Sequence, residues 1–196
     1  MNPAFPKTRK LTTQAKAGKK YGGDLAKGKY MMDMAKKRKG GVNIHPTAIV
    51  SKKAKLSEDI EVGPYALIED DVKIGRRVKV YSHAHILNHT LIGDDCQIHM
   101  GAVLGHLPQI RQKTTEQGRL NIGQKNIFRE YATVHRSSQD RGTTVIGDDN
   151  YFMAFSHIAH DCNIGSHVTI CNGALIAGYV QICDYAFISV VFLSKS

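Results

Sequence analysis

The stretch that decides the fold is residues 50–104, VSKKAKLSEDIEVGPYALIEDDVKIGRRVKVYSHAHILNHTLIGDDCQIHMGAVL. Every sixth residue in it is aliphatic, from Val50 to Leu104. The same step resumes at Ile122, and 22 of the 24 positions from Val50 to Ile188 are apolar. A period of six fits neither an α-helix nor an isolated amphipathic strand. It does fit short strands that wind into a narrow prism, so the sequence predicts a parallel β-helix.

We call each set of residues spaced six apart a lane, and the aliphatic positions form the inward lane. Two further lanes repeat with the same period. The residue four positions after each aliphatic one is small or β-branched, as in Ala66 and Val72. The residue immediately after the aliphatic one is often glycine, as at Gly63, Gly93 and Gly105. Small residues leave room for the inward aliphatic side chains. We expect the glycines to stand at corners of the prism and to supply φ values that β-branched residues cannot reach.

Two stretches interrupt the six-residue pattern, which resumes in the same register after each of them. Residues 105–119 and residues 136–143 are rich in polar and turn-forming residues, and we interpret both as loops. Loops carried by a rigid scaffold are common positions for functional residues.

The formal net charge of +10 belongs to the N-terminal segment alone. Residues 1–40 hold 12 of the 27 basic residues and two of the 17 acidic ones, which leaves residues 41–196 neutral. This division predicts a disordered basic arm, 1–40, and a β-helix domain, 41–196. The arm is a solvated tail, a stretch upstream of a later true start, or a segment that binds RNA or anionic lipid. The neutral body argues against a nucleic-acid surface there.

Composition also bears on location. No apolar run approaches the length of a membrane-spanning helix. The four cysteines form no C-x-x-C pair, and a chain of this size does not need disulfides. We therefore expect a reducing, cytoplasmic compartment and no transmembrane segment.

One segment contains candidate catalytic residues, Phe155-Ser156-His157-Ile158-Ala159-His160-Asp161-Cys162. Ile158 is an inward position, so His157 and His160 are expected on exposed surface. A histidine held through one ring nitrogen by a carboxylate can act as a general base near neutral pH. The spacing alone favours a structural, hydrogen-bonded His–Asp pair on a strand surface, because two histidines and an acid within five residues are a weak motif.

This segment and the repeat around it resemble the hexapeptide-repeat acyltransferases, specifically the UDP-N-acetylglucosamine O-acyltransferases that begin lipid A synthesis. The resemblance covers residues 43–189 and is carried by the strings Ile44–Val50, Ile127–Glu130, Thr133–Arg136, His157–Cys162 and Ala177–Gly178. It implies an all-β, left-handed parallel β-helix of about eight coils.

The resemblance also implies a reaction. A (3-hydroxy)fatty acyl group would pass from acyl carrier protein to the 3-hydroxyl of UDP-N-acetylglucosamine. His160 would be the general base, Asp161 would orient its ring, and the backbone N–H of Gly178 would bind the oxyanion. The residues around the sugar nucleotide would be His157, His135, Gln109 and Tyr179. The family further implies a homotrimer with substrates between subunits, and neither a metal nor another cofactor.

Three positions depart from the family pattern, which has an acid at Ile110, a lysine at Gln112 and a histidine at Tyr179. Loss of the acid removes a hydrogen-bond acceptor for the sugar, so we expect weaker substrate binding. The resemblance ends after Ser189, which predicts a truncation or frameshift near residue 190. Only Val190–Leu193 then remain to cover the last coil.

Two other functions stay open at this point. A shortened, non-catalytic trimer could keep the scaffold and bind a ligand or partner. A trimeric zinc hydratase on the same prism would need about three metal ligands, for which His157, His160 and a neighbouring subunit's histidine are candidates.

Overall fold

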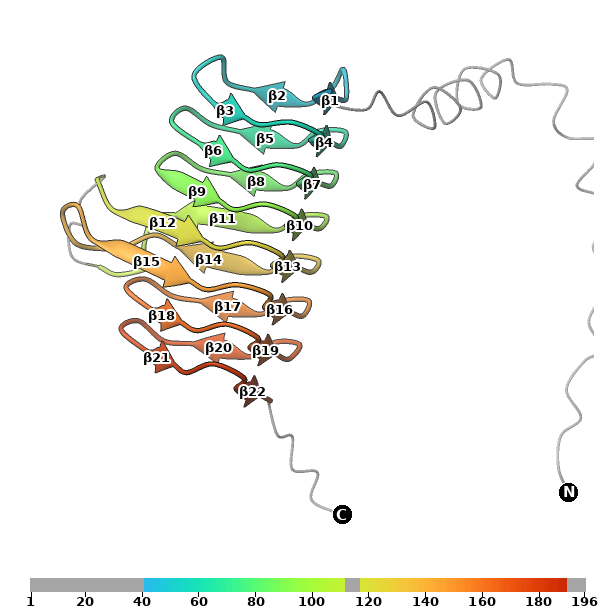
Figure 1. Cartoon of the computed structure of the whole chain (residues 1–196). Helices are drawn as coiled ribbons and strands as arrows, with labels where there is room; N and C mark the ends of the chain where they lie inside the picture. The colour runs from blue at the N-terminus through green and yellow to red at the C-terminus, as the bar shows by residue number, and fades with distance from the viewer. Residues whose placement is uncertain (1–40, 112–116, 190–196) are drawn as a thin grey trace, which may run out of the picture. The chain divides into compact units, whose positions relative to one another are not determined.

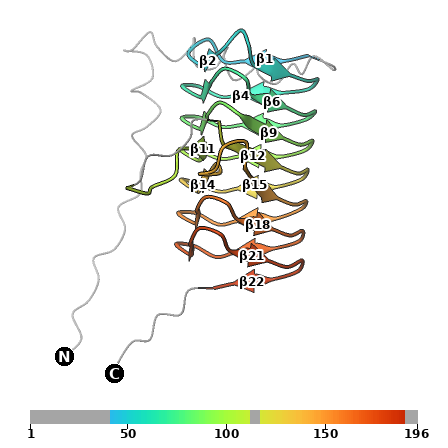
Figure 2. The ribbon, with the colours of Figure 1, turned by 90° about the vertical axis from the view of Figure 1, so that its left-hand side faces the viewer.

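A computed structural model describes residues 41–111 and 117–189. The predicted basic arm, Gln112 and Val190–Leu193 therefore lie outside the described residues. The two described stretches form a column of stacked coils (Figures 1 and 2), and all of their regular structure is β-strand.

Each coil contributes one short strand to each of three parallel sheets. The first sheet contains β1 (Asn43–Ile44), β4 (Glu61–Val62), β7 (Lys79–Val80), β10 (Gln97–Ile98), β13 (Ile127–Phe128), β16 (Tyr151–Phe152), β19 (Thr169–Ile170) and β22 (Phe187–Ile188). The second contains β2 (Ile49–Val50), β5 (Leu67–Ile68), β8 (His85–Ile86), β11 (Val103–His106), β14 (Thr133–His135), β17 (His157–Ile158) and β20 (Leu175–Ile176). The third contains β3 (Lys55–Leu56), β6 (Lys73–Ile74), β9 (Thr90–Ile92), β12 (Arg119–Ile122), β15 (Thr143–Ile146), β18 (Asn163–Ile164) and β21 (Gln181–Ile182).

The register places equivalent residues of successive coils above one another. Ile44 pairs with Val62, and Val62 pairs with Val80. The sheets hold eight, seven and seven strands, so the described residues make seven complete coils and the first strand of another. This agrees with the expectation of about eight coils.

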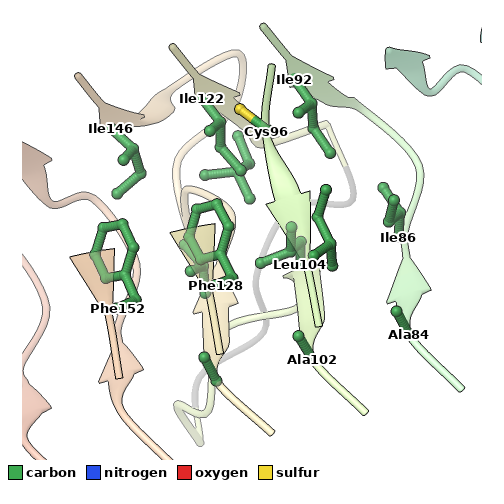
Figure 3. Close-up of a cluster of buried hydrophobic side chains, with 14 of the residues drawn as sticks. Ala84, Ile86, Ile92, Cys96, Ala102, Leu104, Ile122, Phe128, Ile146 and Phe152 are labelled. Atoms are coloured by element: carbon green, nitrogen blue, oxygen red, sulfur yellow. The ribbon is translucent and has the colours of Figure 1, made fainter. Parts of the chain in front are cut away.

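The predicted inward lane forms the core. Its members from Val62 to Ile182 are buried wherever the lane is unbroken, and the small-residue lane packs beside them. Phe128 and Phe152 occupy the lane in adjacent coils, and their rings stack with centroids 4.6 Å apart (Figure 3). Full burial of a side chain of this size contributes about 1.5–3 kcal/mol, so each ring stabilises the middle of the column.

The expected role of the glycine lane is wrong except at Gly105, whose φ is +87°. The other lane glycines permit close approach of the next coil. At Gly93, for example, an added Cβ would lie 2.6 Å from the backbone of Gly123. Positive φ occurs instead at the turns, three residues before the inward residue, and there it is adopted by residues such as Tyr65 and Asp161.

The two predicted loops are confirmed as interruptions, with strands at their borders. β11 extends into the first stretch as far as His106, and β12 begins at Arg119. The second stretch separates β14 from β15 and projects from the column (Figure 1). Both lie between the second and third sheets, so this corner of the prism carries additional chain.

Candidate active site

The predicted reactive residues meet at the corner between the second and third sheets. His160 and Asp161 follow β17, and Gly178 and Tyr179 follow β20 in the next coil. Ser138 follows β14 in the preceding coil. Because β14, β17 and β20 are neighbours in one sheet (Figure 1), the segments after them are stacked as well.

His160 and Asp161 form a hydrogen-bonded pair. The distance between His160 Nδ1 and Asp161 Oδ2 is 2.7 Å, and the two side chains are only 10% and 9% exposed. The expectation that His160 stands on open surface is wrong, because neighbouring turns cover it. The left-handed φ of 59° at Asp161 sets the backbone of this turn, and its N–H donates to Thr144 Oγ1 at 2.8 Å.

The Asp161 carboxylate accepts further hydrogen bonds from the loop after β14. Ser137 Oγ donates to Oδ1, while Ser138 donates to Oδ2 through both Oγ, at 2.6 Å, and its backbone N–H, at 3.1 Å. Burial raises the pKa of Asp161, but the hydrogen bonds from Ser137, Ser138 and His160 outweigh it, so the pKa is lowered overall. The group is therefore a carboxylate at neutral pH, and it can stabilise a positive charge on His160.

Gly178 lies directly against the ring of His160. A Cβ at this position would be 2.8 Å from Cε1 and 2.9 Å from Nε2 of His160, so a side chain there would displace the ring. Within the described part of the chain, the Gly178 N–H donates no hydrogen bond. The ring of Tyr179 meets that of His160 edge-on with centroids 5.2 Å apart.

A row of histidines continues from this pair along the second sheet. His135 contacts His157 edge-on at a centroid separation of 4.7 Å, and His106 lies 6.0 Å from His135 on the other side. Thr133 Oγ1 is 2.7 Å from His157 Nδ1. Burial, assisted by the charges of the neighbouring histidines, lowers the pKa of His135 to about 4, and burial and His160 also lower that of His157.

His135 is therefore neutral at pH 7. It is only 3% exposed, and its Nδ1 is buried with no hydrogen-bond partner among the described residues. A polar ring atom in this state is costly unless a ligand satisfies it. The row thus provides uncharged hydrogen-bonding groups beside the His160–Asp161 pair.

Of the predicted site residues, Gln109 stands apart. It is exposed beyond the end of β11, and no hydrogen bond or ring contact joins it to the other described site residues. Sequence reasoning missed Ser137, Ser138 and Thr144 as partners of Asp161. The only sequence feature that pointed to the two serines was their place in residues 136–143, which were interpreted as a loop on a rigid scaffold.

The described ranges contain no three His, Cys, Asp or Glu side chains arranged to hold a metal ion. The zinc alternative therefore gains no support from a single chain. No helix in the same ranges is long and apolar enough to cross a membrane.

Comparisons with known proteins agree with this architecture. Residues 71–106 and 143–178 match the family model described as bacterial transferase hexapeptide (six repeats). These residues are hexapeptide repeats, and the chain has the left-handed parallel β-helix fold expected from its sequence.

Within that class, the chain is similar to a group of acyltransferases. It is 46% identical over 145 residues to the acyl-[acyl-carrier-protein]–UDP-N-acetylglucosamine O-acyltransferase of Thermodesulfovibrio yellowstonii, covering 74% of this chain and 56% of the relative. The corresponding enzyme of Verminephrobacter eiseniae is 50% identical over 147 residues, with the same coverage of 74% and 56%. LpxA of Acinetobacter baumannii has a TM-score of 0.71 at 37% identity, over 74% of this chain and 56% of that structure.

The resemblance inferred from the sequence is confirmed by these matches. The chain spans just over half the length of the curated relatives it matches.

Proposed function

We propose that the protein transfers a (3-hydroxy)fatty acyl group from acyl carrier protein to the 3-hydroxyl of UDP-N-acetylglucosamine, the first step of lipid A biosynthesis. The observation that carries the proposal is the buried His160–Asp161 pair facing the backbone of Gly178, within coils similar to those of enzymes named for this reaction.

The site supplies the groups that such a transfer needs. Asp161 is an ionised acceptor at Nδ1 of His160, so the proton of a neutral ring sits on Nδ1 and Nε2 carries the free lone pair. Nε2 removes the proton from the sugar 3-hydroxyl as that oxygen attacks the thioester carbonyl. The Gly178 N–H donates to the resulting oxyanion. The C–S bond then breaks, and the proton on Nε2 passes to the departing thiolate of the carrier.

The neutral histidines beside this pair suit a sugar nucleotide. His135 and His157 offer hydrogen bonds without the cost of burying a charge, and we assign Gln109 and Tyr179 to the same ligand by resemblance. We further propose a cytoplasmic homotrimer with the ligand between subunits, which would bring additional groups over the exposed side of Tyr179. The division into a basic arm, 1–40, and a β-helix domain, 41–196, remains a prediction.

Incubation of the full chain with acyl-acyl carrier protein and UDP-N-acetylglucosamine tests the proposal. We expect a product heavier by one acyl group, identified by mass spectrometry as the 3-O-ester, and one equivalent of free carrier thiol. If the trimer binds the sugar nucleotide but forms no ester, the protein is a non-catalytic relative, as Ile110 would favour. Stoichiometric zinc in the purified protein would favour a hydratase instead.

A further inference from the structure

The Asp161 carboxylate belongs to a hydrogen-bonded group that includes residues of the coils on either side. Ser137 and Ser138 reach it from the loop after β14. Tyr179, in the turn after β20, contacts Ser138, with 3.2 Å between the two hydroxyl oxygens. Asp161 itself follows β17, so three successive coils contribute to one hydrogen-bonded group.

The hydrogens in this group can be assigned by counting donors. Ser138 Oγ has one proton, and an ionised Asp161 can only accept, so this proton points to Oδ2. Ser138 Oγ must then accept from the hydroxyl of Tyr179. The same reasoning applies to Ser137, whose Oγ accepts from the N–H of Gln139 at 3.1 Å and donates to Oδ1.

Backbone contacts with the start of β12 and the residue before it hold the loop that carries Ser137 and Ser138. The N–H of Ser137 donates to the carbonyl of Arg119 at 3.1 Å. An added Cβ on Gly118 would fall within 1.9 Å of the Ser137 carbonyl oxygen, so the backbones are in close contact. Ser137 is completely buried. The hydroxyls therefore come from a rigid segment, and they restrict the position of the carboxylate rather than follow it.

We propose that Ser137, Ser138 and Tyr179 are positioning residues that hold Asp161, and through it the ring of His160, in the orientation needed for proton transfer. This inference rests on the proposed acyl transfer. The direct partner of the His160 ring is Asp161 Oδ2, and Ser138 supplies two of the three hydrogen bonds to that oxygen. Removing the Ser138 hydroxyl takes one of these three bonds from Oδ2 and so loosens the hold on the carboxylate, although the Ser138 N–H and Ser137 Oγ still contact it. It also leaves the Tyr179 hydroxyl without its acceptor.

The first test compares Ser138→Ala, Ser138→Thr and Tyr179→Phe in steady-state acyl transfer. Ser138→Ala should lower kcat by about 10- to 100-fold, the range for losing a hydrogen bond to a charged group, with KM for UDP-N-acetylglucosamine nearly unchanged. Ser138→Thr keeps the hydroxyl and should restore kcat. Tyr179→Phe should give a smaller loss, and the Ser138→Ala/Tyr179→Phe double variant should lose no more than Ser138→Ala alone.

Ser51→Ala is the matched control. Ser51 Oγ also donates to an aspartate of the next coil, Asp70, but far along the column from His160. This variant should keep wild-type kcat. A kcat for Ser138→Ala equal to wild type, or an equal loss in Ser138→Thr, would overturn the proposal. So would a Tyr179→Phe effect that adds fully to that of Ser138→Ala. Because Tyr179 is 61% exposed, Tyr179→Phe should fold even if Ser138→Ala does not.

A second measurement does not depend on activity. Carbon-13 NMR of the Asp161 carboxyl should give a titration midpoint below the ordinary value in the wild-type chain, and a higher midpoint in Ser138→Ala and Tyr179→Phe. Unchanged midpoints would contradict the positioning role even if the enzyme is active. A wild-type chain that forms no ester but shows the shifted midpoints would instead reject the proposed function and leave the positioning role intact.

Discussion

Replacement of Gly178 by alanine tests the close contact between this residue and the ring of His160. The backbone of Gly178 does not lie in the left-handed region, so alanine introduces no backbone strain there. Its Cβ would instead lie 2.8 Å from His160 Cε1 and 2.9 Å from Nε2. Ordinary carbon contacts begin near 3.4 Å, so the ring must withdraw by roughly 0.6 Å.

Such a displacement acts on the reactive nitrogen. His160 is tied to Asp161 at 2.7 Å, so the ring either rotates about that bond or stretches it. Misplacement of a catalytic group by about 1 Å costs on the order of 100-fold in rate, so we expect Gly178→Ala to lower kcat by about 10- to 100-fold. Radiolabelled acyl transfer at saturating substrate measures this loss.

Gly173→Ala is the control in the preceding turn of the same coil. A Cβ at Gly173 meets no atom within 4 Å, but its φ of +66° is unfavourable for alanine. That variant should lose about 1 kcal/mol of stability and keep its kcat per folded molecule. A Gly178→Ala enzyme with wild-type kcat would show instead that proton transfer does not require the present position of the His160 ring.

Three further predictions follow from the described residues. Because the pKa of His135 is lowered to about 4 whereas an unfolded histidine titrates near 6.5, the unfolded state binds more protons between these values. Stability should therefore fall by up to about 3 kcal/mol as the pH decreases from about 6.5 to 4, and His135→Gln should flatten this dependence in urea unfolding. Ile110→Asp restores an acceptor at a partly exposed position, and should lower KM for UDP-N-acetylglucosamine up to about tenfold with kcat unchanged in initial-rate assays. Phe152→Ala removes one ring of the stack with Phe128 and should cost about 3–5 kcal/mol in chemical denaturation, whereas Phe152→Leu should cost much less.

The fold was predictable because its signal is repeated in every coil. Ile98 and Phe128 belong to one lane in the sequence and to adjacent strands of one sheet in the structure, although a loop lies between them. The glycine lane was misjudged because a period does not distinguish a backbone that needs positive φ from one that needs space. The close contact of Gly93 with the next coil shows that glycine is needed there because a Cβ would not fit.

The site was predictable only in part. His160 and Asp161 are adjacent in the sequence, so their pairing could be expected, and the resemblance added Gly178. Ser137 is separated from Asp161 by 24 residues, where the regular spacing between coils at this prism is 18. The contact between Ser137 and Asp161 depends on the path of the loop between β14 and β15, which the six-residue repeat does not specify.

The proposed reaction requires His160 to remove the proton from the sugar hydroxyl during acyl transfer. The direct measurement is the rate of ester formation by purified wild type and His160→Ala, from acyl-acyl carrier protein and UDP-N-acetylglucosamine, with the assembly state of both checked by sedimentation. We predict ester formation by the wild type and a loss of at least about 100-fold in the variant with unchanged assembly, the lower end for loss of a general base. A variant that transfers acyl groups at nearly the wild-type rate would contradict the account.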